Sequence, residues 1–473
     1  MKIEVDSVIR IEQPPQELIT WCSNQLVMAN PAYAKLLNMG RRPWSIPPSI
    51  VFYSWYDGRL VLPRGLLKAI WDIYPDLSLY DHRMNKCQPV TFRSDIQLRS
   101  YQQPAVQAVR AGKQGIIVMP CGAGKTETAL QVIAELGQPA LWITHTNDLL
   151  NQSLGRAKDK LHLQEGEVGI IGAGSYTIGS HITFSTVQSL KSKDLDSIGH
   201  RFGTVVVDEC HRAFMSDSKL GMFEHVLEHL PALYRIGVTA SEHRSDGLIK
   251  GMYYLLGKKL YEVHQEELNQ AGNVMTPEVI AVPTGYRYQG DTTLEFGAML
   301  CDMIEAAERN YVIMDQLIKN GGRPALILGD RLEQLKRLSG EMEGMEDGVE
   351  FICGQTGRKA REAAINRMRS GESHMLFATY ALAKEGLDIP RLERLYLCTP
   401  HRDKVAVQQS VGRIMRPAPG KEAPVVYDFV DEQEGLCMSQ FRSRKTVYRK
   451  LGCTINEDRL RAYQVKIKGA KAV

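Results

Sequence analysis

A run of small residues followed by lysine and threonine is the part of this sequence best suited to chemistry. Residues 119–126 read Met-Pro-Cys-Gly-Ala-Gly-Lys-Thr, between an apolar run (Gly115–Met119) and a helical pattern (Lys125–Leu136). Glycines let the backbone curl around a phosphate, and the helix N-terminus adds the positive end of its dipole. The predicted nucleotide-binding residues of this loop are Pro120, Cys121, Gly122, Ala123, Gly124, Lys125, Thr126 and Glu127.

Two residues of the loop have specific predicted roles. Lys125 reaches the β and γ phosphates of a nucleotide such as ATP, and the hydroxyl of Thr126 ligates Mg²⁺. Met119 stands where the usual pattern has its first glycine, so the loop alone is a weak signal. A second element on the same sheet is needed to support a nucleotide site.

That second element is a pair of carboxylates at the end of an apolar run. Asp208 and Glu209 directly follow Thr204–Val207. A carboxylate at the carboxyl end of a strand beside the phosphate loop is well placed for a second Mg²⁺ contact. We predict that Asp208 holds the metal and that Glu209 orients and deprotonates the attacking water. The competing interpretation is a pair of surface carboxylates.

The elements that position these residues follow a repeated order of short apolar runs and amphipathic stretches. Continuous apolar strands separated by helices indicate a parallel sheet covered on both faces, so we predict two α/β units in tandem. The runs are 115–119, 140–144, 182–185, 204–207 and 234–238 in the first unit, and 325–328, 349–353, 374–378, 392–398 and 425–429 in the second. Residues 268–290, rich in Gly and Pro, predict a linker, and 294–320 a long helix.

The first 92 residues have a different composition and are predicted to form a small α+β accessory domain. Residues 49–61 alternate as a β-hairpin with Asp57-Gly58 as its turn. Trp21, Trp44, Trp55 and Trp71 are interpreted as the core of this domain. Its arginines (Arg41, Arg42, Arg59 and Arg64) leave a nucleic-acid surface or a partner surface open. The predicted boundaries are 1–92, 93–275 (ATP-binding), 276–437 (linker and second unit) and 438–473 (basic helical extension).

Composition sets the class of protein. The 473 residues suggest roughly three domains, and 44% hydrophobic and 24% charged residues are typical of a globular protein. The net charge is +4, but residues 438–473 hold ten Lys or Arg against two Asp or Glu, which suits a phosphate-rich partner or a solvated helix face. The nine cysteines form no CxxC pair, and no apolar run suits a signal peptide or membrane helix. We expect a soluble, cytosolic protein, in a bacterial or phage-infected cell.

In order along residues 98–429, the sequence resembles superfamily 2 helicases and translocases, which have two RecA-like domains. Asp208-Glu209-Cys210-His211 is similar to their DExH box. The resemblance implies that Gln102, with Arg99, reads the adenine edge, and that Thr239 and Ser241 couple ATP hydrolysis to movement. It also implies nucleic-acid contacts in the first unit, at Thr144, His145, Thr146, Ser185, Thr186 and Gln188.

In the second unit, Gln409-Ser410-Val411-Gly412-Arg413-Ile414-Met415-Arg416 matches the family's QxxGRxxR motif. Arg413 and Arg416 are three residues apart and fall on one helix face, from which they are expected to reach the γ-phosphate across the cleft between the domains. Arginine suits this role because it is planar, charged and bidentate. By resemblance Gln409 also belongs to the catalytic set. Thr379 is expected to contact nucleic acid, and Gly386 and Asp388 the nucleotide.

Further motifs resemble the UvsW, XPB and type III restriction-motor branch. They are Thr239-Ala240-Ser241 with Arg244 and Asp246-Gly247, then Glu308-Arg309-Asn310, and Tyr427-Asp428-Phe429-Val430-Asp431 with Arg442, Arg444 and Tyr448. This resemblance implies an ATP- and Mg²⁺-dependent DNA helicase or translocase acting on single-stranded, duplex or branched DNA. The alternatives are a DExH RNA helicase and the motor subunit of a restriction or defence complex. A non-catalytic binding module is disfavoured because the catalytic residues are intact.

Overall fold

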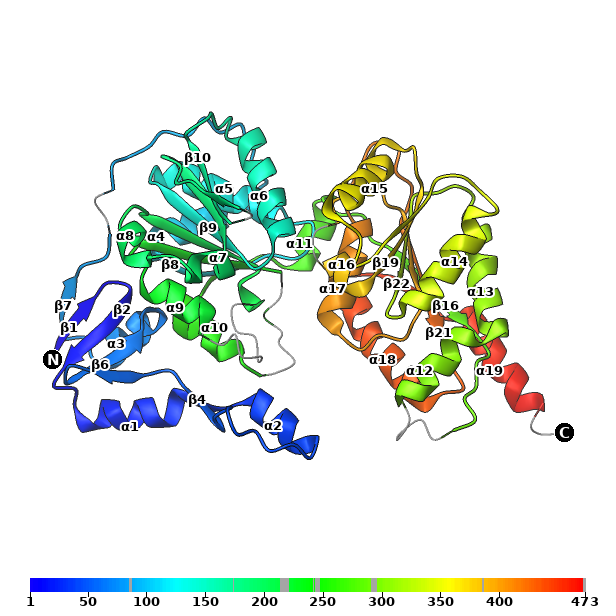
Figure 1. Ribbon diagram of the computed structural model, residues 1–473, viewed down its shortest axis with the longest axis horizontal. Helices are drawn as coiled ribbons and strands as arrows, with labels where there is room; N and C mark the ends of the chain where they lie inside the picture. The colour runs from blue at the N-terminus through cyan, green and yellow to red at the C-terminus, as the bar shows by residue number, and fades with distance from the viewer. Residues whose placement is uncertain are drawn as a thin grey trace. The chain divides into compact units, whose positions relative to one another are not determined.

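The computed structural model describes residues 1–84, 87–172, 174–212, 221–240, 242, 247–290, 296–384 and 387–470. They form two compact units. Unit 1 contains residues 1–120 and 124–263, and unit 2 contains residues 121–123 and 264–473. Figure 1 shows that each unit contains a sheet with helices on both sides, as predicted from the alternation of apolar runs and amphipathic stretches.

The N-terminal domain of unit 1 is built on a separate sheet with the strand order β5-β6-β2-β1-β7. The strands are β1 (Lys2–Val5), β2 (Val8–Glu12), β5 (Ser54–Tyr56), β6 (Arg59–Pro63) and β7 (Ser78–Asp81), and a separate pair is formed by β3 (Val27–Ala29) and β4 (Ser49–Val51). The helices are α1 (Gln16–Gln25), α2 (Pro31–Asn38), η1 (Arg64–Leu66) and α3 (Leu67–Ile73). The domain is α+β, as expected.

The predicted hairpin is confirmed in part. Tyr56 pairs with Arg59 across a two-residue turn, and Asp57 and Gly58 adopt positive φ values of 50° and 69°. Both central residues of a type I′ turn require positive φ, which Asp-Gly provides. The start of the predicted hairpin was wrong, because residues 49–51 pair with β3 instead.

The tryptophans do not form the core of the N-terminal domain, which corrects the interpretation from the sequence. Trp44 is 86% exposed, Trp55 50% and Trp71 39%, while Trp21 is only partly buried. Phe52 and aliphatic side chains from strands and helices fill the core. Those from alternate strand positions are Ile3, Val5, Ile9, Ile11, Leu60 and Leu62, and those from α1, its C-cap and α3 are Leu18, Leu26 and Ile70. These smaller side chains suffice because the core continues into the rest of unit 1.

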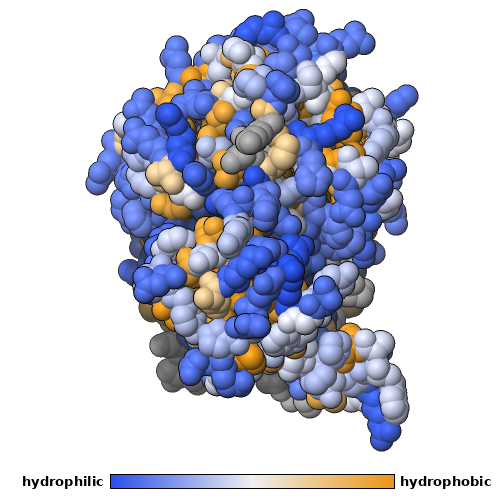
Figure 2. Space-filling model, turned by 90° about the vertical axis from the view of Figure 1, so that its left-hand side faces the viewer, coloured by the Kyte–Doolittle hydropathy of each residue, from blue (hydrophilic) through white to orange (hydrophobic). Residues whose placement is uncertain are grey.

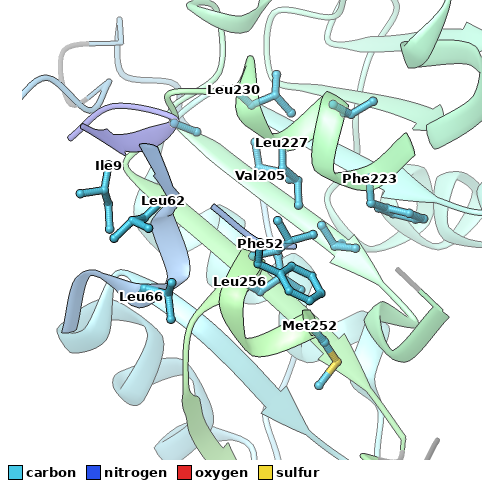
Figure 3. Close-up of a cluster of buried hydrophobic side chains, with 14 of the residues drawn as sticks. Ile9, Phe52, Leu62, Leu66, Val205, Phe223, Leu227, Leu230, Met252 and Leu256 are labelled. Atoms are coloured by element: carbon cyan, nitrogen blue, oxygen red, sulfur yellow. The ribbon is translucent and has the colours of Figure 1, made fainter. Parts of the chain in front are cut away.

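That continuous core docks the N-terminal domain on the part of unit 1 that holds the main sheet. Figure 3 shows Ile9, Leu62 and Leu66 on one side of the cluster, with Leu227 and Leu256 among the residues on the other. Burial of apolar surface on this scale removes both faces from water and disfavours independent motion.

Two buried arginines add polar contacts across the same boundary. Arg64 donates from Nη1 to the carbonyl of Ala232 at 2.6 Å and from Nε to Oε1 of Gln114 at 2.7 Å. In the other direction, Nη2 of Arg235 donates to the carbonyl of Ser7 at 3.1 Å. Burial lowers the pKa of Arg235 to about 9, so the surrounding carbonyls are needed to stabilise its charge.

The main sheet of unit 1 has the strand order β11-β10-β12-β9-β13-β14-β8-β15 and is parallel except for β11. Its strands are β8 (Gln114–Val118), β9 (Ala140–Thr144), β10 (Val168–Gly172), β11 (Ser175–Tyr176), β12 (Ile182–Thr186), β13 (Thr204–Asp208), β14 (Tyr234–Thr239) and β15 (Lys259–Glu262). Its helices are α4 (Gln103–Gly112), α5 (Lys125–Leu136), α6 (Asn147–Lys160), α7 (Val187–Lys191), α8 (Leu195–Gly199), η2 (Cys210–Arg212), α9 (Met222–Glu228) and α10 (Ile249–Leu256).

The sheet of unit 2 is parallel, in the order β18-β19-β17-β20-β21-β16-β22. Its strands are β16 (Glu278–Pro283), β17 (Ala325–Gly329), β18 (Val349–Ile352), β19 (Met375–Thr379), β20 (Arg394–Leu397), β21 (Val425–Val430) and β22 (Thr454–Asn456). Its helices are α11 (Gln265–Gln270), α12 (Phe296–Glu305), α13 (Ala307–Ile318), α14 (Leu332–Glu343), α15 (Arg358–Ser370), α16 (Tyr380–Lys384), α17 (Lys404–Ile414), α18 (Gly435–Lys450) and α19 (Asp458–Ala470).

Two predictions for the second half of the chain were wrong. Residues 278–283, predicted as linker, form β16 inside the sheet, because their apolar residues outweigh the flanking Gly and Pro. The predicted helix over 294–320 is two helices, α12 and α13, which are separated at Ala306 in an extended conformation. None of the described helices is both long enough and apolar enough to cross a membrane.

Candidate active site

The predicted phosphate loop and carboxylates meet at the carboxyl edge of the unit 1 sheet. Strands β13, β14 and β8 are neighbours, so the residues that follow them share this edge. The loop turns through Gly122 and Gly124, whose φ values are 84° and 78°. The N–H of Met119 donates to the carbonyl of Thr239 at 2.8 Å, which anchors the loop to the end of β14. The side chain of Met119, at the position where the usual pattern has glycine, is fully buried.

Lys125 and Glu209 lie side by side at this edge. Nζ of Lys125 is 3.7 Å from Oε1 of Glu209, and the N–H of Glu209 donates to Oδ1 of Asp208 at 2.9 Å. Glu209 has a φ of 47°, in the left-handed region that non-glycine residues rarely adopt. Such strain costs about 1–3 kcal/mol and is concentrated at functional sites. The backbone thus holds the Glu209 carboxylate beside the lysine at a conformational cost.

Asp208 is buried at the end of β13 next to Glu209. Burial and the neighbouring Glu209 raise the pKa of Asp208, while Lys125 and a hydrogen bond from Ser153 oppose the rise. A carboxylate in this position is stabilised by an added cation. The donor set of Asp208 and the Thr126 hydroxyl consists of hard oxygen atoms, which Mg²⁺ prefers, so these residues fit the implied metal.

Gln102, predicted to read adenine, lies against the phosphate loop. Its Nε2 donates to the carbonyl of Gly124 at 3.3 Å, and its Oε1 accepts from the N–H of Arg99 at 2.8 Å. Arg99 in turn donates from Nη1 to the hydroxyl of Tyr101 at 2.8 Å. The structure therefore brings the predicted adenine-reading element and the phosphate loop together.

Glu127, in the first turn of α5, is half-buried and forms an ion pair with Arg156 of α6 at 2.8 Å. Sequence reasoning missed Arg156 and Ser153, both on α6. Neither residue belongs to a recognisable motif, and only the packing of α6 beside α5, β9 and β12 brings them to the site.

The DExH box and the coupling motif are in direct contact. Nδ1 of His211 lies 2.8 Å from Oγ1 of Thr239 and 3.3 Å from Oε2 of Glu209. His211 thus links the carboxylate predicted to act on water with the end of β14. The second predicted coupling residue, Ser241, lies outside the described residues, as do Arg244 and Asp246.

The predicted nucleic-acid residues of unit 1 also lie at the carboxyl edge, after β9 and β12. Several of their side chains are used internally. The buried hydroxyl of Thr144 donates to the carbonyl of Thr146, that of Ser185 to the carbonyl of Ile171, and Thr186 caps α7. Thr146 likewise caps α6.

Only part of this set faces outward. Gln188 is exposed and donates from Nε2 to the carbonyl of His145 at 3.1 Å, which joins the two predicted segments. His145 is half-buried. Contacts from this edge to a nucleic-acid backbone would therefore use Gln188, His145 and main-chain groups rather than the buried hydroxyls.

In unit 2, Arg413 lies in the last turn of α17, whereas Arg416 lies just beyond the helix, which ends at Ile414. The prediction that both arginines share one helix face was therefore wrong. Arg413 donates from Nε to the carbonyl of Ala383 at 3.2 Å, and Arg416 forms an ion pair with Asp388. Gln409 is buried on the same helix, and Thr379 ends β19. Sequence analysis named both partners of the Arg416–Asp388 pair but not their contact.

Gly386, predicted to contact the nucleotide, lies outside the described residues.

The other motif residues of unit 2 form buried ion pairs. Nε of Arg309 lies 2.7 Å from Oδ1 of Asp431, and both side chains are fully buried. Arg444 contacts Asp428 at 2.7 Å, and the hydroxyl of Tyr448 donates to the same carboxylate at 2.6 Å. These pairs fasten α13 and α18 to β21, which gives the motifs a structural role.

Comparisons with known families agree with this arrangement. Residues 95–244 match the family described as "Type III restriction enzyme, res subunit", and residues 309–418 match "Helicase conserved C-terminal domain". Each match falls on one of the two parallel-sheet domains.

Similar proteins include helicases named for RNA and for DNA. The chain is 27% identical to a mimivirus protein named "Putative ATP-dependent RNA helicase", over 80% of this chain and 72% of the relative. It is 25% identical to "DNA 3'-5' helicase XPB" of Mycobacterium tuberculosis, over 77% of this chain and 66% of the relative. The fold is similar to the structure of Saccharomyces cerevisiae Dbp5 bound to RNA and ADP BeF3, with a TM-score of 0.55, 15% identity, and coverage of 86% of this chain and 97% of that one.

Motifs, fold and family matches agree on the ATP-dependent motor domains. The chain is a superfamily 2 helicase related to XPB and to the res subunit of type III restriction enzymes, with two RecA-like domains and a small N-terminal α+β domain.

Proposed function

We propose that the chain couples ATP hydrolysis to movement along DNA, or to the remodelling of branched DNA. The observation that carries this proposal is the meeting of Lys125, Asp208 and Glu209 at one sheet edge, with Gln102 against the phosphate loop. DNA is favoured by the relatives named as DNA helicases and by the match to a restriction-enzyme family. Unwinding, branch migration and fork remodelling all use this chemistry.

The roles in hydrolysis follow from charge and position. Lys125 neutralises phosphate oxygens, and Glu209 accepts the proton of the attacking water. Thr126 and Asp208 would hold Mg²⁺, which would supply positive charge to the phosphates. Arg413 and Arg416 add positive charge to the transition state.

Coupling to movement is assigned to the contact between His211 and Thr239. A change in the hydrogen bonding of Glu209 during hydrolysis alters the position of His211, which lies 3.3 Å from it. Because His211 also contacts Thr239, the change reaches the end of β14.

A second candidate function is an ATP-dependent RNA helicase. It is favoured by the mimivirus relative, whose name specifies RNA. RNA-specific recognition depends on contacts to the 2′-hydroxyl. A DNA motor instead relies mainly on phosphate contacts, which tolerate either sugar and are sensitive to salt.

The catalytic part is tested with Lys125→Ala and Glu209→Gln in an ATPase assay. We expect both variants to lose turnover by at least about 100-fold. We expect Glu209→Gln to keep binding ATP, because the lysine and the loop remain. Lys158→Ala and Glu135→Gln, on exposed or paired surface positions of unit 1, are the matched controls. Normal turnover by either active-site variant contradicts the assignment.

The substrate is tested by measuring ATPase rates with single-stranded, duplex, forked and four-way DNA and with RNA, at two salt concentrations. Stimulation by DNA that falls with salt supports the proposal. Stimulation by RNA alone favours the second candidate. If no nucleic acid stimulates the isolated chain, the result points to the motor subunit of a larger restriction or defence complex.

A further inference from the structure

We infer that the arm of the N-terminal domain, residues 27–51, is a second nucleic-acid-binding element that stacks an unpaired base on Trp44. The inference rests on the proposed function as a nucleic-acid motor. It adds a binding surface that belongs to none of the helicase motifs. The arm consists of β3, α2, a proline-containing loop and β4, and Figure 1 shows α2 projecting from the strands of this domain.

The arm is a defined structure. Asn30 caps α2 by accepting from the N–H of Ala32 at 3.0 Å, and its Nδ2 donates to the carbonyl of Pro47 at 2.9 Å. The N–H of Asn30 also donates to the carbonyl of Pro48 at 2.9 Å. One buried side chain therefore closes the base of the loop that carries Trp44.

An aromatic residue lies at the surface of this loop. Trp44 is 86% exposed, although a tryptophan normally contributes its large apolar area to a core. The guanidinium of Arg42 lies 5.8 Å from the centre of its ring. A planar ring beside a cation is the combination on which single-stranded nucleic acids stack.

The positive charge of the arm indicates which kind of partner it binds. Between Glu17 and Asp57 the sequence contains no Asp or Glu, but it contains Lys35, Arg41 and Arg42. Figure 2 views the molecule from the side of the N-terminal domain, and its hydrophobic side chains lie scattered among hydrophilic ones rather than in one large area. The arm also exposes the aliphatic side chains of Leu37 and Met39. Because the segment is basic and acid-free and Trp44 stands beside Arg42, we favour a phosphate backbone with an accessible base as the partner over a protein surface.

The arm moves with the ATP-binding domain. The N-terminal strands share the core shown in Figure 3 with unit 1, and Arg64 and Arg235 join the two parts by hydrogen bonds. A base held at Trp44 is therefore fixed relative to the domain that binds ATP. This gives the motor a contact on the strand that is independent of the contacts after β9 and β12.

The test measures binding of fluorescent DNA with an unpaired tail, the matching blunt duplex, and an RNA of the same sequence. We expect Trp44→Ala to weaken binding of the tailed DNA by about tenfold or more, because stacking on an aromatic side chain is lost. Trp44→Phe should retain most of the affinity. The double variant Arg41→Ala/Arg42→Ala should reduce the slope of log K against log salt concentration for single-strand binding by about 1.4, because two phosphate contacts are lost.

Matched variants separate this effect from general damage. Trp71→Ala removes an exposed tryptophan beside Asp72 in the same domain, and Arg93→Ala/Arg110→Ala removes two arginines that already pair with carboxylates. Both should bind like the wild type. Thermal unfolding of every variant checks that the exposed substitutions leave the fold intact.

The outcomes are distinct. If the wild type binds and is stimulated by nucleic acid but Trp44→Ala binds equally well, the arm is not a binding element and the proposed function stands. If the wild type neither binds nor is stimulated by any nucleic acid, both proposals fall. If Trp44→Ala loses equal affinity for the tailed DNA and for the RNA, the arm binds bases and phosphates of both nucleic acids. If it loses affinity for the DNA alone, the arm is specific for DNA.

Discussion

At the carboxyl edge of the unit 1 sheet, Asp208 is the last residue of β13 and lies beside Glu209, with Lys125 3.7 Å from that second carboxylate. Asp431 follows β21 in unit 2, where Arg309 and the hydroxyl of Thr284 each contact it at 2.7 Å. Both aspartates are buried and both end strands of parallel sheets.

The difference lies in how each charge is balanced. Burial and then the neighbouring Glu209 raise the pKa of Asp208, so the charged form of this carboxylate is unfavourable unless a cation neutralises it. Although burial alone would lower the pKa of Arg309, the carboxylate of Asp431 raises it, so that pair is balanced. A buried carboxylate at a strand end is therefore suited to bind a metal ion when no neighbouring cation balances its charge. It stabilises the fold when a buried arginine balances its charge.

The largest expected effect concerns an arginine of unit 2 outside the buried pairs. Arg413→Ala should reduce ATP turnover by about 10³-fold, because it removes a charge that stabilises the transition state. Single-turnover ATPase assays and equilibrium nucleotide binding measure the two steps. Turnover near the wild-type rate would remove Arg413 from the catalytic set.

Asp208→Asn tests the unbalanced carboxylate. It should lower turnover by at least about 100-fold through loss of the metal contact. The free energy of unfolding should change by no more than about 1 kcal/mol, because a costly buried charge is neutralised while one acceptor oxygen remains. Urea denaturation measures the free energy of unfolding, and a separate ATPase assay measures turnover. A large loss of stability with normal turnover would give Asp208 the structural role assigned to Asp431.

Asp431→Asn tests the balanced carboxylate. It leaves the buried Arg309 without its charge partner and should lower the free energy of unfolding of unit 2 by about 3–5 kcal/mol. At temperatures where unit 2 remains folded, Asp431→Asn should reduce ATP turnover by a smaller factor than Asp208→Asn does. Differential scanning calorimetry resolves the unfolding transitions. Unchanged stability would contradict the role of the pair in holding α13 on β21.

Gly65→Ala tests the boundary between the N-terminal domain and the rest of unit 1. A Cβ at Gly65 would lie less than 3.0 Å from the main-chain oxygens of Tyr253 and Tyr254 at the end of α10. The substitution should destabilise unit 1 by about 1–3 kcal/mol through overpacking, measured by urea denaturation.

The matched control gives the smallest effect, with the opposite sign. Gly155 lies exposed in α6 of the same unit, and a Cβ there meets no atom of the described residues within 4 Å. Gly155→Ala should stabilise unit 1 by about 0.5–1 kcal/mol, because alanine loses less backbone freedom on folding. Destabilisation by both substitutions would indicate that close packing is not the reason for Gly65.

The amino-acid sequence by itself determined the two parallel-sheet domains and the chemistry-bearing motifs. Strands such as β9 and β13 are continuous runs of apolar residues, and the loop before Lys125 follows from its glycines and the helix behind it. These signals are local, because hydrophobic periodicity, turn residues and the residues that begin helices can each be recognised within a short stretch of sequence.

Only the tertiary structure decided which charges are balanced and where the aromatic residues lie. Arg309 and Asp431 are 122 residues apart, and nothing near either one predicts that they pair. Trp44 is exposed because Phe52 and the aliphatic side chains fill the core that the N-terminal domain shares with the rest of unit 1. Burial and ion pairing depend on contacts between distant segments, whereas the strands and the phosphate loop depend on neighbouring residues.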